Sequence, residues 1–113
     1  MKTILVTISL LLATSSFAGN KDPNWENPDA RYSAGKNQVS QILVTHRVVS
    51  NVQEECNKES IKRGSGKFGF AIDACSFWDY SPGKNVCTIV TGSTTSMHEM
   101  GHELRHCFQG VFH

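Results

Sequence analysis

The chain has 113 residues, with 11 basic and 10 acidic side chains and a formal net charge of +1 at pH 7. A nearly neutral chain without a basic cluster gives no argument for nucleic acid or an anionic membrane surface as a partner. Its length suffices for one domain with one modest hydrophobic core.

Residues 1–18 have the features of a secretory signal peptide. Lys2 supplies the positive charge, Ile4–Ala13 is apolar, and Ser16 and Ala18 are small residues of the kind needed at a cleavage site. The apolar stretch is shorter than the ~20 residues that span a bilayer. We therefore expect cleavage near Ala18, no stable membrane anchor, and a mature protein that is periplasmic or secreted.

The exported chain is predicted to consist of a polar arm, residues 19–37, and a single α+β domain, residues 38–113. The arm is rich in Pro, Asn and Asp, which favours an extended or irregular backbone. Its large aromatic side chains, Trp25 and Tyr32, are the candidates for holding it against the domain.

The domain is predicted to begin with a strand and a helix. Residues 41–49 are β-branched and apolar, as is typical of a strand. Residues 51–63 have helical spacing, with Asn51 as the N-cap and Gly64 after the last turn. The side chains expected to face the core from this helix are those of Val52, Cys56 and Ile61.

A β-hairpin follows this helix. Residues 68–80 carry alternating apolar side chains, and residues 85–91 form the return strand. The sequence Ser-Pro-Gly-Lys at 81–84 has Pro and Gly at the two central positions of a type II turn. A two-residue turn places Cys75 opposite Val90.

Four cysteines in a short exported chain indicate two disulfides. None of them forms a CxxC pair, the spacing typical of a cysteine metal site. The hairpin register disfavours a Cys75–Cys87 bridge, and the pairing otherwise stays open. The four residues are Cys56, Cys75, Cys87 and Cys107.

The last predicted helix spans residues 97–109. Ser96 and Glu99 form the S-x-x-E pattern of a capping box, and Gly110 suits the left-handed position after the helix end. The element order of strand, helix, hairpin and helix predicts a small α+β fold, with a mixed or antiparallel sheet and two helices.

The chemistry of the chain is concentrated at its C-terminal end, where four of the five histidines lie within residues 98–113. Side chains at i and i+4 share one helix face and lie about 6 Å apart along the axis, so two imidazoles can converge on one metal ion. A glutamate directly after the first histidine can act as a base on a metal-bound water. The four residues are His98, His102, His106 and His113.

The HExxH pattern resembles the signature of the zincin metallopeptidases, and both HEMGH (98–102) and HELRH (102–106) match it. The resemblance is limited to the C-terminal helix and the turn after it. It implies a zinc-dependent peptidase in which zinc polarises the scissile carbonyl. In this class of enzyme, the glutamate takes a proton from water and passes it to the leaving group.

The two matches share one histidine, and they are alternatives because His98 and His106 lie about 12 Å apart along the axis. The second match continues as HELRHCFQGVFH, which resembles the metzincin layout with one extra residue before the glycine. We favour this register, which implies that the metal ligands are His102, His106 and His113.

In the favoured register Glu103 is the general base, and Glu99 remains available for the helix cap. In the alternative register the ligands are His98 and His102, and Glu99 is the base. The favoured register is the one that supplies its own third ligand, at the end of the printed chain.

The sequence therefore predicts an exported zinc metallohydrolase that acts on a peptide or protein, with cell-wall peptides among the candidate substrates. Two other classes stay open: a non-catalytic periplasmic zinc-binding protein, and a small disulfide-stapled interaction module with incidental histidines. His46 is a weaker candidate for orienting substrate, and Tyr80 and Arg105 for stabilising an oxyanion. The more ordinary expectation for Arg105 is an ion pair with a surface carboxylate.

Overall fold

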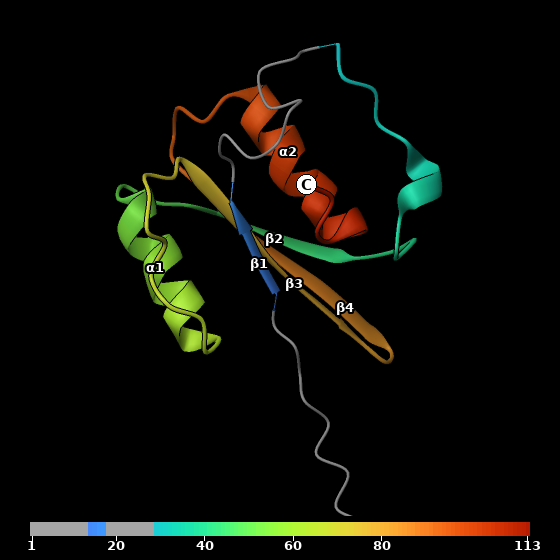
Figure 1. Cartoon of the computed structure of the whole chain (residues 1–113), viewed down its shortest axis with the longest axis horizontal. Helices are drawn as coiled ribbons and strands as arrows, with labels where there is room; N and C mark the ends of the chain where they lie inside the picture. Colours follow the sequence, from blue (N-terminus) through green and yellow to red (C-terminus); the bar gives the residue numbers. More distant parts are fainter. Residues whose placement is uncertain (1–13, 18–28) are drawn as a thin grey trace, which may run out of the picture.

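A computed structural model of the chain describes residues 14–17 and 29–113 (Figure 1). Most of the predicted signal peptide and Trp25 lie outside the described residues. From residue 38 onward the elements follow the predicted order of strand, helix, hairpin and helix. The elements are β1 (Thr14–Phe17), the short 3-10 helix η1 (Ala34–Lys36), β2 (Leu43–Val48), α1 (Val52–Lys62), β3 (Ala74–Ser81), β4 (Lys84–Thr91) and α2 (Met97–Gln109).

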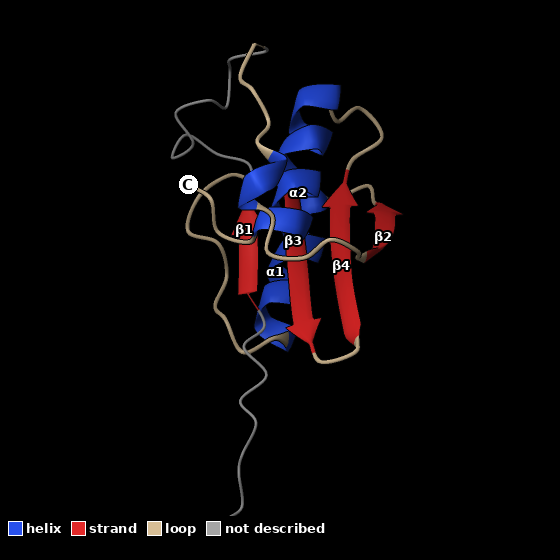
Figure 2. Cartoon of the chain, turned by 90° about the vertical axis from the view of Figure 1, so that its right-hand side faces the viewer, coloured by secondary structure: helices blue, strands red, loops and turns tan. Residues whose placement is uncertain are grey.

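The strands form one small mixed sheet in the order β1-β3-β4-β2, seen side by side in Figure 2. β3 and β4 are the antiparallel hairpin, β2 runs parallel to β4, and β1 pairs antiparallel with the outer edge of β3. β1 lies within the segment predicted as a signal peptide, and export stays a prediction. Among the described residues no helix is long and apolar enough to span a membrane.

The two helices cover opposite faces of the sheet (Figure 1). Successive strand residues point to opposite faces, so one strand can serve two cores. Phe77 and Val90 pack with residues on the α1 side, while Trp78 and Ile89 belong to a second cluster on the α2 side. The α+β fold is confirmed, with a thin apolar layer on each face of the sheet.

One disulfide staples each helix to the sheet. Cys56 of α1 is bonded to Cys75 of β3, and Cys87 of β4 is bonded to Cys107 of α2. The predicted pair of disulfides is thus confirmed, and the disfavoured Cys75–Cys87 bridge is not formed. Because each apolar layer is small, these covalent links add to the attachment of both helices.

The hairpin has the predicted register, with Cys75 opposite Val90 and Ser81 opposite Lys84. Gly83 has a φ of +77°, as the second central position of the predicted turn requires.

The strand before this turn starts later than predicted, at Ala74 rather than at residue 68. The backbone N–H groups of Phe68 and Ile72 donate to side-chain oxygens of Asn57 and Gln53 on α1. Residues 68–72 therefore run along α1 instead of extending the sheet, and Phe68 and Ile72 belong to the same apolar cluster as Cys56.

The first helix begins as predicted, since the Asn51 side chain accepts a hydrogen bond from the backbone of Glu54 at 3.0 Å. The prediction that Ile61 faces the core was wrong, because this side chain is 51% exposed. The buried positions are Glu59 and Ser60, which lie three and four residues after Cys56 on the same helix face. A salt bridge to Arg47 allows the glutamate to be buried there.

Candidate metal centre

The helix that carries the histidines, α2, has the predicted bounds and the predicted N-cap. The Ser96 hydroxyl accepts a hydrogen bond from the backbone N–H of Glu99 at 3.1 Å, which satisfies one of the unpaired donors at the helix start. The helix face against the sheet is unusually polar. Its buried residues are His102, Glu103, His106, Cys107 and Gln109.

After α2 the chain reverses sharply at Gly110. Its φ is positive, as predicted, but its ψ of −133° lies outside the left-handed helical region. This backbone conformation is the mirror image of an extended one and is essentially restricted to glycine. A Cβ atom here would also lie 3.5 Å from side-chain atoms of Gln38 and Trp78. The reversal returns Phe112 and His113 to the side of the helix.

The carbonyl groups in the last turn of α2 are satisfied by other elements, as a buried helix end requires. Tyr80 of β3 donates its hydroxyl proton to the carbonyl of Cys107 at 2.7 Å. The backbone N–H of Gln38 donates to the carbonyl of Phe108 at 2.8 Å. The side-chain amide of Gln38 donates to the carbonyl of Gln109 at 3.1 Å. Burial raises the pKa of Tyr80. This hydroxyl anchors the helix, so the structure gives it a positioning role instead of the oxyanion role considered from sequence.

Three imidazole rings converge beside this reversal. The Nε2 atom of His106 lies 3.2 Å from Nε2 of His102 and 3.0 Å from Nε2 of His113. Nitrogens bound to one tetrahedral zinc ion are separated by about 3.3–3.5 Å, given Zn–N bonds of about 2.0–2.1 Å. Among the described residues these three histidines form a group that could hold a metal ion, with ligand atoms within 4.8 Å of one another.

A backbone hydrogen bond orients the central ring of this group. Nδ1 of His106 lies 2.6 Å from the carbonyl oxygen of Gly110. A carbonyl oxygen can only accept, so Nδ1 carries the proton and Nε2 presents a lone pair. Histidines that bind metals are typically oriented in this way by a hydrogen bond from the other ring nitrogen. The glycine thus both turns the chain and fixes the tautomer of His106.

Two aromatic side chains pack against the same ring. The indole of Trp78 stacks parallel to the His106 ring at 5.4 Å between centroids, and Phe112 lies at 4.2 Å. Phe112 also contacts the ring of His102 at 5.3 Å. His102 and His106 are buried, whereas His113 is half-buried and forms the side of the cluster nearest to solvent. A low-dielectric shell of this kind strengthens electrostatic interactions at the cluster.

The two candidate glutamates occupy different places on α2. Glu103 is fully buried next to His102, and its carboxylate accepts a hydrogen bond from the hydroxyl of Ser76 on β3. Glu99 is half-buried in the first turn, three residues after the N-cap Ser96. Glu103 therefore lies between the helix and the sheet, whereas Glu99 lies in the first turn of α2, one turn before His102.

The other residues considered from sequence are not part of this group. His98 lies one turn before His102. His46 on β2 is hydrogen-bonded through Nε2 to the hydroxyl of Thr91, at 2.7 Å. Arg105 does not make the expected ion pair with a surface carboxylate in the part of the chain described. It stacks on Phe112 instead, with its Cζ atom 3.9 Å from the ring centroid.

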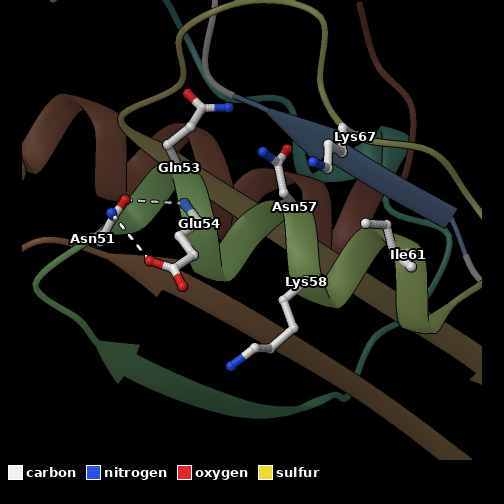
Figure 3. A pocket seen from close by; sticks show the side chains of 7 residues that line it. All are labelled: Asn51, Gln53, Glu54, Asn57, Lys58, Ile61 and Lys67. Carbon is white, nitrogen blue, oxygen red and sulfur yellow. Dashed lines mark hydrogen bonds between the residues drawn. The ribbon is translucent and has the colours of Figure 1, made fainter.

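Three residues of the site were not predicted from the sequence: Ser76, Trp78 and Phe112. Alternation along β3 places Ser76 and Trp78 on one face, two residues apart, but the sequence did not reveal that α2 covers this face. Figure 3 shows a separate hollow along α1, whose lining residues include Asn57, Ile61 and Lys67. None of the clustered histidines lines that hollow.

The polar arm contacts the site through the helix end. Tyr32 is 51% exposed, and its hydroxyl is hydrogen-bonded within the arm to Asn37. The link to the domain is instead the buried side-chain amide of Gln109, which donates to the carbonyl of Ser33 and to the side-chain oxygen of Asn37.

Comparison of the chain with protein-family models, with curated proteins and with solved structures gave no match.

Proposed function

We propose that the protein is a zinc-dependent hydrolase that cleaves peptide bonds. The observation that carries this proposal is the convergence of three Nε2 atoms from His102, His106 and His113. A set of three protein ligands is typical of catalytic zinc sites, which keep a coordination position for water or substrate, whereas structural sites have four. Imidazole nitrogen is a ligand that zinc favours, and zinc itself is not redox-active.

Bound zinc would act as a Lewis acid on the scissile carbonyl and would acidify a coordinated water. The residues of the chain supply the rest of the chemistry. Glu103 adjoins a metal ligand on the same helix, and Ser76 holds one of its carboxylate oxygens. We assign to Glu103 the transfer of a proton from water to the leaving amine, a step that typically contributes about 10²–10⁴-fold to the rate.

The class of substrate rests on the zincin-like sequence HELRH at 102–106 and on the predicted export of the chain. Both favour a peptide or protein outside the cytoplasm, with cell-wall peptides among the candidates. His113 is half-buried, whereas His102 and His106 are buried, so His113 marks the side of the cluster nearest to solvent. A substrate would therefore approach the metal past Phe112 and His113.

One contact favours a second candidate function, that of a non-catalytic zinc-binding protein. The hydrogen bond between Ser76 and Glu103 is fully buried, and a bond of this kind would also serve to attach α2 to the sheet. In that case the carboxylate of Glu103 would be a structural group. The protein would then bind zinc without hydrolysing peptides, and removing the charge of Glu103 would leave zinc binding unchanged.

The substitution Glu103→Gln separates the two candidates, because glutamine keeps the shape and can still accept from Ser76. Digests of a mixed peptide library by the zinc-loaded protein, followed by mass spectrometry, would report hydrolysis, and elemental analysis would report bound zinc. We expect one zinc per chain in the variant and a loss of about 10²-fold or more in rate. Glu99→Gln is the matched control, since glutamine also completes a capping box, and it should keep both properties. Equal rates for the wild-type protein and Glu103→Gln would exclude the proposed base.

A further inference from the structure

Arg105 is held in one orientation beside the metal cluster. Its Nε–H donates to the side-chain oxygen of Gln109 at 2.8 Å, and one face of its guanidinium lies over the ring of Phe112. Gln109 is itself buried and is fixed by two hydrogen bonds to the arm. The guanidinium is therefore constrained both at one edge and at one face, as in preorganised binding sites.

These contacts leave the terminal edge of the guanidinium available. Of its five N–H donors, the Nε–H is used by Gln109, and the remaining four belong to the two terminal nitrogens. That edge is the one that binds carboxylates through two parallel hydrogen bonds. Within the described residues Arg105 forms no ion pair, although its side chain is half-buried.

The positive charge of Arg105 lies close to the proposed zinc ligands. Arg105 follows His102 by three residues, so the two side chains are neighbours on the surface of α2. The ring of Phe112 links them further, since it contacts the guanidinium and the rings of both helical ligands. Two ring contacts in series thus separate the guanidinium from the ligand set.

We propose that Arg105 binds a carboxylate on the substrate residue that follows the scissile bond. This inference rests on the proposed function and names the substrate class: peptides cleaved next to their free C-terminus, or next to an acidic residue. Successive residues of an extended peptide are about 3.3–3.6 Å apart and charge-assisted hydrogen bonds are about 2.7–2.9 Å long, so we assign the carboxylate to the residue directly after the scissile bond. In the reaction the hydroxyl of water joins the carbonyl carbon, the C–N bond breaks, and the leaving amine takes the proton. Arg105 holds the carboxylate of that amine product.

Three peptides that differ only at the last residue test the proposal. One has a free C-terminal carboxylate, one is amidated, and one is amidated with glutamate as its last residue. We expect the zinc-loaded protein to prefer the free acid over the neutral amide by about 100-fold in kcat/KM, through KM. Preference for the glutamate amide over the free acid would assign the carboxylate to a side chain and exclude cleavage at a free C-terminus.

The variant Arg105→Gln should remove this discrimination, and Arg105→Lys should restore part of it. Lys84→Gln removes one positive charge at the distant hairpin turn and should change nothing. Since Arg105 also packs on Phe112, a purely structural role would slow all three peptides equally. An equal loss on all three peptides, or equal rates in the wild-type protein, would overturn the proposal.

A second measurement does not need hydrolysis. The ¹⁵N-edited signal of the Arg105 Nε–H can be followed while N-acetylphenylalanine or its amide is added to the zinc-free protein. A saturable shift caused by the acid alone supports the carboxylate site even if no peptide is cleaved. The absence of any shift with the acid would refute it, whatever the fate of the proposed hydrolase activity.

Discussion

Replacing Gly110 by alanine should weaken both the fold and the metal site. The φ of +64° and ψ of −133° are strained for any residue with a Cβ, at a cost of about 1–3 kcal/mol. The new Cβ would meet Gln38 and Trp78 at an ordinary 3.5 Å, so the cost arises from the backbone and not from a clash. For a domain of this size each kcal/mol lowers the melting temperature by about 4–8 °C.

The same substitution should also reduce zinc affinity by at least about tenfold, which corresponds to 1.4 kcal/mol. Any relaxation of the backbone at Gly110 moves the carbonyl that accepts from His106 and displaces His113 from the cluster. Thermal unfolding with and without zinc, together with competition against a chelator of known affinity, would measure both effects.

Two other glycines provide the controls. Gly64 also has a positive φ, of +81°, but ends the remote helix α1, so Gly64→Ala should lower stability and leave zinc affinity unchanged. Gly101 is exposed within α2, and a Cβ there meets nothing within 4 Å. Gly101→Ala should therefore raise stability, by about 0.5–1 kcal/mol. If Gly110→Ala behaved like Gly64→Ala, with zinc affinity intact, the role assigned to the reversal would be refuted.

Two further predictions concern the disulfides and Glu59, the buried glutamate of α1. Replacing both Cys87 and Cys107 by serine should lower the free energy of unfolding by about 2–5 kcal/mol and also weaken zinc binding. The Cys56/Cys75 double variant should lose stability with little change in zinc affinity. Similar losses of zinc affinity in both variants would contradict this prediction. For Glu59, burial alone would raise the pKa, but the neighbouring Arg and Lys side chains outweigh it and lower the pKa below its usual 4.5. Its contribution to stability is then present above pH 4.5 and lost as the pH falls through the folded-state pKa. Thermal unfolding between pH 3 and 7 should show a flatter acid limb for Glu59→Gln, and an unchanged limb would exclude this role.

Local chemistry made α2 the most predictable element. Its N-cap depends on Ser96 and its end on Gly110, and both signals lie within one turn of the helix. The hairpin register was predictable for the same reason, because a two-residue turn determines which residues are opposite each other. The spacing of the histidines on α2 follows from helix geometry alone.

Features that depend on tertiary packing were beyond prediction. The disulfide pairing follows from α1 and α2 covering opposite faces of the sheet, which the apolar pattern of β3 cannot reveal because both of its faces are buried. Ile61 is apolar and near the helical stripe, yet Ser60 takes the buried position by donating to the carbonyl of Gly66. Trp78 and Phe112 join the site through stacking, which leaves no spacing signal in the sequence.

Equilibrium zinc affinity of two histidine variants tests the central claim most directly, and it needs no substrate. The structure groups His106 with His102 and His113, and leaves His98 one turn away. We predict that His106→Ala lowers zinc affinity by about 100-fold or more, because it removes a ligand worth several kcal/mol, while His98→Ala stays within a few-fold of the wild-type protein. If His98→Ala lost zinc and His106→Ala kept it, the ligands would be His98 and His102, and the assignment of both the metal centre and its base would be wrong.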